Sequence, residues 1–255
     1  MDISNSLAFI TGGASGLGLA TAQAVIAAGG RVVLVDVQAE LGQQAASSLG
    51  DRAKFIQADI TDEAQVDAAV ADAVSFLGGL NFVVNCAGVV APGRAVGREG
   101  ALAGSKFSRV IAINLIGTFF VNKATANVMQ HSPANADGER GVIIQTASVA
   151  AFDGQIGQPA YAASKAGVVG MTLPLAREFA RFGVRVVTVA PGLFETPMMA
   201  SLPPEAQQSL AAQVPFPSRL GRPAEYAQLA VGIFGNPMLN GETIRLDGAI
   251  RLEPK

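Results

Sequence analysis

Three side chains in the middle of the chain have the chemistry to move a proton to and from an alcohol oxygen. Tyr161 and Lys165 are four positions apart, so a helix places both on one face. A phenol with a pKa near ~10 is a poor base at neutral pH, but a neighbouring ammonium favours the phenolate and lowers that pKa. Ser148, at the expected end of a strand, can hydrogen-bond the substrate oxygen. The trio therefore predicts interconversion of an alcohol and a carbonyl, with Tyr161 as acid and base.

Each member of the trio also has a structural interpretation. Tyrosine and lysine one turn apart are common on helices, and a serine that ends a strand usually caps or turns the chain. The chain has only two tyrosines, however, and this one is accompanied by both partners. Asn114, inside an expected helix, is a fourth catalytic candidate because it can hold a water that links Lys165 to solvent. His131, the single histidine, is expected to end that helix, and no metal is expected.

A glycine-rich loop upstream of the trio predicts a dinucleotide site. Residues 11–18 follow an apolar strand and open a helix, an arrangement that offers backbone N–H groups and a helix dipole to phosphate. Gly12 permits the tight turn, while Gly16 and Gly18 permit close approach of a pyrophosphate and close helix–strand packing. A bare glycine pattern is often only a turn. The strand and helix on either side favour the dinucleotide interpretation.

Two acids and a run of small residues extend this predicted cofactor site. Asp36 ends the second expected strand, where it can accept from both ribose hydroxyls and repel a 2′-phosphate, so we predict NAD over NADP. Its alternative role is that of a helix N-cap. Asp59 can accept from the adenine amino group or, alternatively, cap the helix that starts near Asp62. The fourth expected strand ends in four residues that let backbone pass close to a ribose: Asn85, Cys86, Ala87 and Gly88. Cys86 is interpreted as a small buried residue, without a neighbouring base to make it a nucleophile.

The elements that must position these residues alternate between strand and helix. Apolar or β-branched runs predict strands at residues 7–11, 31–37, 53–58, 81–86, 142–146, 185–189 and 243–246. Helices are predicted at residues 16–28, 39–49, 63–76, 106–129, 161–182 and 224–234. This order predicts an α/β fold, a Rossmann-type doubly wound parallel sheet of about seven strands with helices on both faces. One domain spans residues 1–255, residues 91–105 are irregular, and residues 192–217, with a helical piece at 205–212, form a lid.

Composition narrows the class of protein. The chain of 255 residues is 50% apolar and only 15% charged, against a typical charged share of roughly 25%. We expect much of its surface to be covered by other subunits, a sticky monomer being the alternative. Net charge is −2 without a basic run, which gives no electrostatic support for a nucleic-acid or membrane partner. One cysteine cannot form an internal disulfide. A start without a cationic stretch predicts a cytoplasmic protein.

Taken together, the motifs resemble the short-chain dehydrogenase/reductase family over essentially the whole chain. The matching features are the glycine loop at 11–18, the run at 85–88, Asn114, Ser148, the Tyr161–Lys165 pair and Pro191 with Gly192. The resemblance implies serine–tyrosine–lysine catalysis with a supporting asparagine, and a homotetramer.

Within that family, the chain is similar to the subgroup of 3-hydroxyacyl-CoA dehydrogenases of type 2, also called 17β-hydroxysteroid dehydrogenases of type 10. The similar stretches are residues 10–21, 141–144, 146–152, 170–174, 190–194, 213–221, 240–242 and 244–251. The resemblance implies NAD-dependent oxidation of an (S)-3-hydroxyacyl-CoA, branched short chains included, to a 3-ketoacyl-CoA. A second hypothesis keeps the chemistry and takes a hydroxysteroid or another secondary alcohol without CoA. A third, a dinucleotide sensor that has lost catalysis, is disfavoured because Tyr161 and Lys165 are both present.

The resemblance also implies particular contacts. Cofactor contacts fall on Gly12, Ser15, Gly16, Leu17, Gly18, Asp36, Asp59, Ile60, Asn85, Cys86, Ala87, Gly88, Tyr161, Lys165, Pro191, Phe194 and Thr196. Substrate contacts fall on Ser148, Gln155, Gln158 and Tyr161. Residues 93–107 depart from the subgroup, which has a lysine-bearing insertion there. If that insertion holds CoA phosphates, Arg94, Arg98 or Lys106 would substitute for it here; the alternative is that these three are solvated surface charges. Glu195 replaces a small residue of the subgroup, which alters lid packing.

Overall fold

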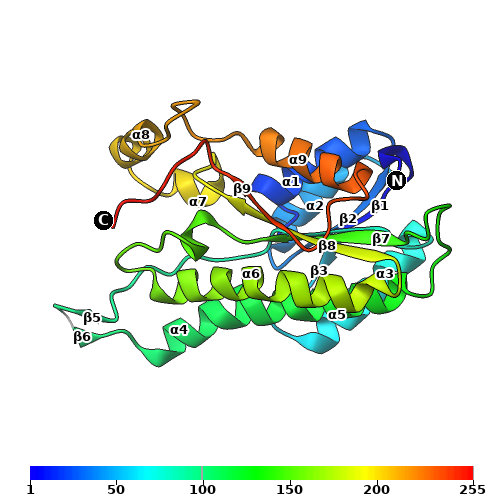
Figure 1. Cartoon of the computed structure of the whole chain (residues 1–255), viewed down its shortest axis with the longest axis horizontal. Coiled ribbons are helices and arrows are strands. Elements are labelled where there is room, and N and C mark those ends of the chain that lie inside the picture. Colours follow the sequence, from blue (N-terminus) through cyan, green and yellow to red (C-terminus); the bar gives the residue numbers. More distant parts are fainter. Residues whose placement is uncertain (99, 255) are drawn as a thin grey trace.

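The computed structural model of the chain describes residues 1–98 and 100–254, and its main feature is a parallel sheet (Figure 1). The seven strands of this sheet are β1 (Leu7–Thr11), β2 (Arg31–Asp36), β3 (Ala53–Gln57), β4 (Phe82–Asn85), β7 (Gly141–Thr146), β8 (Val184–Pro191) and β9 (Thr243–Leu246). Their spatial order is β3-β2-β1-β4-β7-β8-β9, and every neighbouring pair is parallel. The predicted doubly wound sheet is therefore confirmed. The order reverses between β1 and β4, the point where open α/β sheets form a crevice at the carboxyl ends of their strands.

Helices cover both faces of the sheet because the strands are apolar on both faces. One face carries α3 (Glu63–Leu77), α4 (Gly104–Ile111), α5 (Thr118–Met129) and α6 (Pro159–Ala180), and the other carries α1 (Gly16–Ala27), α2 (Ala39–Leu49) and α9 (Pro223–Gly235) (Figure 1). Neighbouring residues of β1 point into opposite layers: Phe9 into the core under α3, α5 and α6, and Ile10 into the core under α1, α2 and α9. Strands buried on both sides in this way are typical of parallel sheets.

The predicted helix at 106–129 differs in the structure because its middle is wound as a π-helix. The segment η2 (Ala112–Gly117) separates α4 from α5. Gly117 in this segment lies against Ile60, since an added Cβ would be 2.7 Å from the Ile60 Cγ1 atom. The wider turn brings Asn114 toward the site, and single π turns of this kind are frequent at functional sites.

Short elements occupy the connections around the crevice. The segment predicted to be irregular contains a two-stranded antiparallel hairpin, β5 (Val96–Gly97) and β6 (Gly100–Ala101). After β8 come α7 (Pro197–Ala200), which the sequence did not predict, and α8 (Pro204–Ala212), which corresponds to the expected helical piece. Two 3-10 turns, η1 (Ile3–Asn5) and η3 (Val149–Ala151), complete the elements.

Two kinds of feature are not found in residues 1–98 and 100–254. None of the helices there combines the length and the hydropathy needed to cross a membrane. Histidine, cysteine, aspartate and glutamate side chains are not grouped in threes as metal ligands in that part of the chain.

Candidate active site

The glycine loop between β1 and α1 is packed so tightly that side chains are excluded at two of its positions. A Cβ on Gly12 would lie 2.7 Å from the Ala87 backbone nitrogen, and one on Gly18 would lie 2.3 Å from the Gly12 carbonyl oxygen. Gly12 and Gly16 also have positive φ values, 63° and 54°. Ser15 is the N-cap residue of α1, and the first N–H groups of the helix have no acceptor within it. This backbone cradle has the form that the pyrophosphate of a dinucleotide requires.

Asp36 lies beside this cradle at the carboxyl end of β2. Its Oδ2 atom accepts a hydrogen bond from the Ala14 backbone N–H (3.3 Å), and Oδ1 accepts from the Gln38 N–H (3.1 Å). Helix α2 begins at Ala39 with Gln38 as its N-cap, so the alternative role of Asp36 as the N-cap is excluded. The carboxylate is therefore held against the loop, as expected of an acid that faces a ribose.

A neighbouring cavity of about 350 Å³ opens at the end of β3. Its lining residues are Val37, Gln57, Ala58, Asp59 and Gln65. Asp62, and not Asp59, caps α3, because its Oδ1 atom accepts from the N–H groups of Ala64 and Gln65 (3.0 and 3.2 Å). Asp59 instead accepts from the N–H and hydroxyl of Thr61 (2.9 and 2.8 Å). Asp59 therefore lines this cavity and does not cap α3.

The residues that end β4 differ in which way their side chains lie. Asn85 is buried and its Nδ2 group donates to Asn122 Oδ1 (2.9 Å), so only its backbone remains to face the crevice. Cys86 contacts the hydroxyls of Thr146 and Tyr226, and burial raises the pKa of its thiol. A protonated thiol in this environment has no role as a nucleophile, in agreement with its interpretation as a small packing residue.

Asn114 forms a bridge between the segment after β4 and helix α6. Its Oδ1 atom accepts from the Val89 N–H (2.8 Å), and its Nδ2 group donates to the Val89 carbonyl (2.9 Å) and to Ser164 Oγ (3.0 Å). The residue is fully buried. A Cβ on Gly88 would lie 3.3 Å from Asn114 Oδ1 and 3.4 Å from Lys165 Nζ, so Asn114 and the lysine ammonium border the same space. Its amide is engaged within the protein, so a link from Asn114 to a water would have to use its backbone.

The predicted trio meets where β7 ends and α6 begins. Ser148 follows β7, and its Oγ atom accepts from the Ala150 N–H (3.1 Å), which starts the turn η3. Lys165 Nζ donates to the carbonyl of Thr146 (2.7 Å) and lies 5.8 Å from the centre of the Tyr161 ring. The first turns of α6 therefore place both helical members of the trio at the carboxyl end of the central strands.

Burial dominates the protonation of the trio. It lowers the pKa of Lys165 to about 8, against a smaller opposing electrostatic effect of Cys86. It also raises the pKa of Tyr161, against a smaller opposing effect from its hydrogen bond with Ser148. The direction for Tyr161 is opposite to the one expected from the Tyr161–Lys165 spacing. The reason is that a desolvated phenol and a desolvated ammonium each favour their neutral form.

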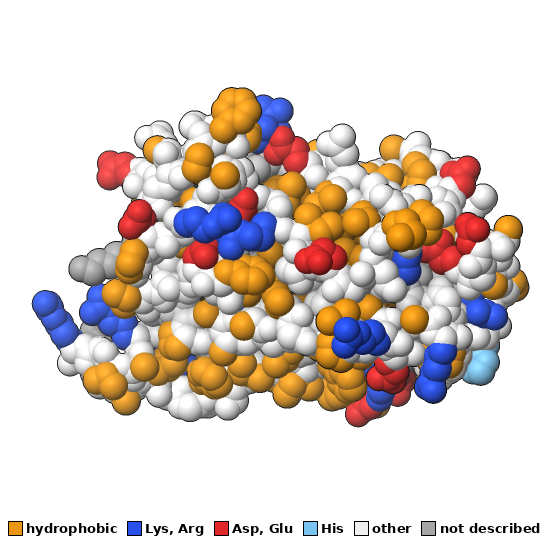
Figure 2. Space-filling view, in the orientation of Figure 1, with side chains coloured by type: hydrophobic (Ala, Val, Ile, Leu, Met, Phe, Trp, Pro, Cys, Tyr) orange, Lys and Arg blue, Asp and Glu red, His pale blue; other side chains and the backbone are white. Residues whose placement is uncertain are grey.

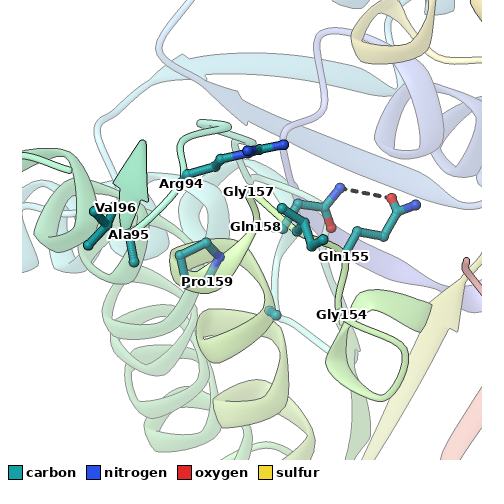
Figure 3. A pocket seen from close by; sticks show the side chains of 10 residues that line it. Arg94, Ala95, Val96, Gly154, Gln155, Gly157, Gln158 and Pro159 are labelled. Atoms are coloured by element: carbon teal, nitrogen blue, oxygen red, sulfur yellow. Dashed lines mark hydrogen bonds between the residues drawn. The ribbon is translucent and has the colours of Figure 1, made fainter. Parts of the chain in front are cut away.

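A second cavity, of about 530 Å³, lies at the amino-terminal end of α6 (Figure 3). It is lined by Arg94, Ala95, Val96, Gly154, Gln155, Ile156, Gly157, Gln158, Pro159 and Ala162. The two glutamines predicted to contact substrate lie here side by side, with Gln158 Nε2 donating to Gln155 Oε1 (3.2 Å). The Oε1 atom of Gln158 is buried and has no hydrogen-bond partner in the described part of the chain. Of the three candidate cations, only Arg94 lines this cavity.

The segment after β8 contacts the glycine loop. Thr196 is the N-cap of α7, and its methyl group lies 3.5 Å from the Cβ position of Gly16 in the glycine loop. Phe194 is buried against Gly221, where an added Cβ would be 2.7 Å from the ring. The predicted contacts Pro191, Phe194 and Thr196 thus belong to a segment that reaches the loop, Thr196 most directly.

Sequence reasoning missed two residues that hold the trio in place. The Thr146 carbonyl accepts from Lys165, and a backbone group of this kind leaves no mark in a sequence. Ser164 accepts from Asn114 and donates to the Tyr161 carbonyl (2.7 Å). Ser164 lies three residues after Tyr161 on the same helix face, and this spacing could have predicted that it supports the trio.

The doubly wound sheet, the glycine cradle and the cluster of Ser148, Tyr161 and Lys165 define a dinucleotide-dependent oxidoreductase of alcohols and carbonyls. A family model described as short chain dehydrogenase matches residues 6–207, and the chain belongs to that family. Members of the family use NAD or NADP.

Named relatives match nearly the full length of the chain. The 3-hydroxyacyl-CoA dehydrogenase type-2 of Drosophila melanogaster is 50% identical over 254 residues, 99% of this chain and 100% of the relative. The protein of the same name from Homo sapiens is 51% identical over 250 residues, 97% of this chain and 96% of the relative. A crystal structure of 3-hydroxyacyl-CoA dehydrogenase type-2 from Mycobacterium avium superposes with a TM-score of 0.94 at 42% identity, covering 99% of this chain and 98% of that one. The resemblance stated from the motifs is confirmed.

The tight packing of the glycine loop generates a prediction. Gly18→Ala places a methyl group against the Gly12 carbonyl, and such overpacking costs about 1–3 kcal/mol. We expect a lower melting temperature and a loss of dinucleotide binding, measured by thermal denaturation and by fluorescence titration with NADH. Gly104→Ala is the matched control, since Gly104 begins α4 with no atom within 4 Å of its Cβ position. Unchanged NADH affinity in Gly18→Ala would contradict the assignment of this loop.

Proposed function

We propose that the protein oxidises (S)-3-hydroxyacyl-CoA thioesters to 3-ketoacyl-CoA thioesters with NAD. The observation that carries this proposal is the 50% identity over nearly the whole chain to a relative named for that activity, together with a buried Ser148 and Lys165 beside Tyr161. The 530 Å³ cavity at the amino-terminal end of α6, with its two glutamines and Arg94, supports a polar substrate that carries an anionic group.

The chain's own residues divide the proton work of the reaction. When bound, the oxidised dinucleotide supplies the hydride acceptor and a positively charged ring beside the site. Tyr161 removes the proton of the substrate hydroxyl, and Ser148 hydrogen-bonds the same oxygen and keeps it in place. Tyr161 takes this proton as the phenolate and becomes a neutral phenol, and Lys165, protonated below its pKa of about 8, stabilises the phenolate before the transfer. In the reductive direction Tyr161 returns the proton.

A substrate panel tests the proposed function. We expect turnover of (S)-3-hydroxybutyryl-CoA with NAD to exceed turnover of free secondary alcohols and hydroxysteroids by orders of magnitude, measured from NADH absorbance. Absence of activity on every CoA thioester tried would contradict the proposal and favour the second hypothesis. Arg94→Ala should raise KM for the CoA thioester and leave KM for a free alcohol unchanged. Arg98→Ala, on the adjacent hairpin but outside the cavity lining, is its control.

The position of Asp36 supports NAD as the coenzyme. Its carboxylate is held against the glycine loop by the Ala14 N–H, where it would repel a 2′-phosphate. We expect a lower KM for NAD than for NADP, and we expect Asp36→Ala to reduce this preference mainly by raising KM for NAD. A wild-type enzyme with the lower KM for NADP would overturn the assignment.

Loss of the phenol and a change of pH should act on the same step. Tyr161→Phe keeps the ring but removes the acid/base group, so we expect a fall in kcat of about 10²–10⁴-fold with nearly unchanged NADH affinity. Because burial raises the pKa of Tyr161, the wild-type oxidation rate, which needs the phenolate, should rise with pH through the neutral range, while the reduction rate, which needs the phenol, should stay nearly constant until the pH approaches that pKa. Stopped-flow or steady-state rates of oxidation and reduction between pH 6 and about 10 measure this pH dependence. A pH-independent oxidation rate limited by chemistry, shown by a deuterium isotope effect, would count against Tyr161 as the base.

We also propose a homotetramer, one domain over residues 1–255, and a lid at about 192–217. Hydrophobic side chains gather on the side of the molecule formed by α4, α5 and α6 (Figure 2), and Phe107, Ile116, Phe119 and Leu173 are 37–44% exposed. Copies of this face can pair in an isologous contact. A single-chain mass by light scattering at micromolar concentration would rule out the tetramer.

A further inference from the structure

The segment that follows β9, residues 247–254, contacts both loops that flank the candidate active site (Figure 1). On the lid side, the Phe216 N–H donates to the Gly248 carbonyl (3.2 Å), and a Cβ on Gly192 would lie 2.9 Å from Asp247 Cα. On the other side, the Ile156 N–H donates to the carbonyl of Pro254 (3.0 Å). One C-terminal segment therefore lies against both walls of the site.

Arg245, near the end of β9, joins this segment to the residues between Ser148 and Tyr161. We call residues 152–158 the substrate loop. The Arg245 Nη2 group donates to Asp153 Oδ2 in the substrate loop (2.6 Å) and to the Ile250 carbonyl (3.0 Å). Its Nε group donates to Asp247 Oδ2 (2.7 Å), and its guanidinium lies 5.2 Å from the Phe152 ring centre. The planar guanidinium thus contacts the substrate loop at Phe152 and Asp153, and the C-terminal segment at Asp247 and Ile250.

The same segment fixes the glutamines of the cavity. Gln155 Nε2 donates to the Glu253 carbonyl (3.0 Å), and Gln155 Oε1 accepts from Gln158 Nε2 (3.2 Å). This chain of hydrogen bonds runs from the cavity wall to the C-terminal segment. The direction in which both amides face the cavity therefore depends on where residues 253 and 254 lie.

We propose that Arg245 is a positioning residue for substrate binding, which acts by holding the substrate loop through Asp153 and through the C-terminal segment. The loop follows Ser148 by one 3-10 turn and precedes Tyr161 by one turn of α6. A displaced loop moves the glutamines of the cavity and the supports of both catalytic residues. The dinucleotide cradle, which lies across β1 and β4, has no contact with this ion pair in the described part of the chain. Only the identity of the substrate in this inference rests on the proposed function.

Kinetics of matched variants test the inference. Asp153→Asn keeps the shape of the partner and removes its charge, and we expect KM for (S)-3-hydroxybutyryl-CoA to rise roughly tenfold, as the loss of a charge-assisted hydrogen bond implies, while the Kd for NADH stays unchanged. Arg245→Lys keeps the charge but loses the planar fork, so it should give a smaller rise. Arg251→Ala is the control: Arg251 donates to the same Asp247 (3.2 Å), its side chain is 63% exposed, and none of its described bonds reaches the substrate loop.

Hydrogen exchange of the Ile156 amide provides a readout that needs no substrate. We expect faster exchange in Asp153→Asn than in the wild type or in Arg251→Ala, at a melting temperature that shows the variant folded. If Asp153→Asn leaves both KM and exchange unchanged, or if it weakens NADH binding as much as substrate binding, the positioning role is wrong. If the wild type is inactive on CoA thioesters but the Ile156 amide still exchanges faster in Asp153→Asn than in the wild type, the proposed function is wrong and the positioning role stands.

Discussion

The close packing of backbone at the turn from β1 to α1 is the constraint on which the site depends. With only 2.3 Å between a Gly18 Cβ and the Gly12 carbonyl, and 2.7 Å between a Gly12 Cβ and the Ala87 nitrogen, the start of α1 can lie directly on the end of β4. That contact is made where the strand order reverses, so it sets the floor of the crevice. Strand β7 is the next neighbour of β4, which explains why Ser148 and the start of α6 come to the same place.

Burial, more than attraction between charges, prepares the trio for proton transfer. Burial lowers the pKa of Lys165 to about 8, and its ammonium group donates to the Thr146 carbonyl. Tyr161 becomes a weaker acid in the same environment. In such an environment the neutral phenol is favoured over the phenolate, and a positive charge beside the ring shifts this balance toward the phenolate.

Features that repeat along the chain could be predicted from the sequence, and those that depend on long-range contacts could not. The seven strands follow from apolar runs, and their ends agree within about two residues. The π-helix could not be predicted, because no proline interrupts residues 106–129 and the hydrogen bonds from Asn114 to Val89 and Ser164 join distant segments. Whether Asp36 and Asp59 cap helices could not be predicted, because the answer depends on the exact residue at which each helix begins. In the structure the N-cap residues are Gln38 and Asp62, two and three positions further along the chain.

The substrate side was less readable for a related reason. The cavity is lined by residues 94–96 and by residues between 154 and 162, the second of which the C-terminal segment contacts. Which side chains face inward depends on turns and not on periodicity. The three basic candidates illustrate this. Arg94 precedes the hairpin and lines the cavity, Arg98 lies in the turn between β5 and β6, and Lys106 lies on the exposed first turn of α4. The hairpin therefore separates cations that look equivalent in the sequence, and of the three only Arg94 lines the cavity beside Gln155 and Gln158.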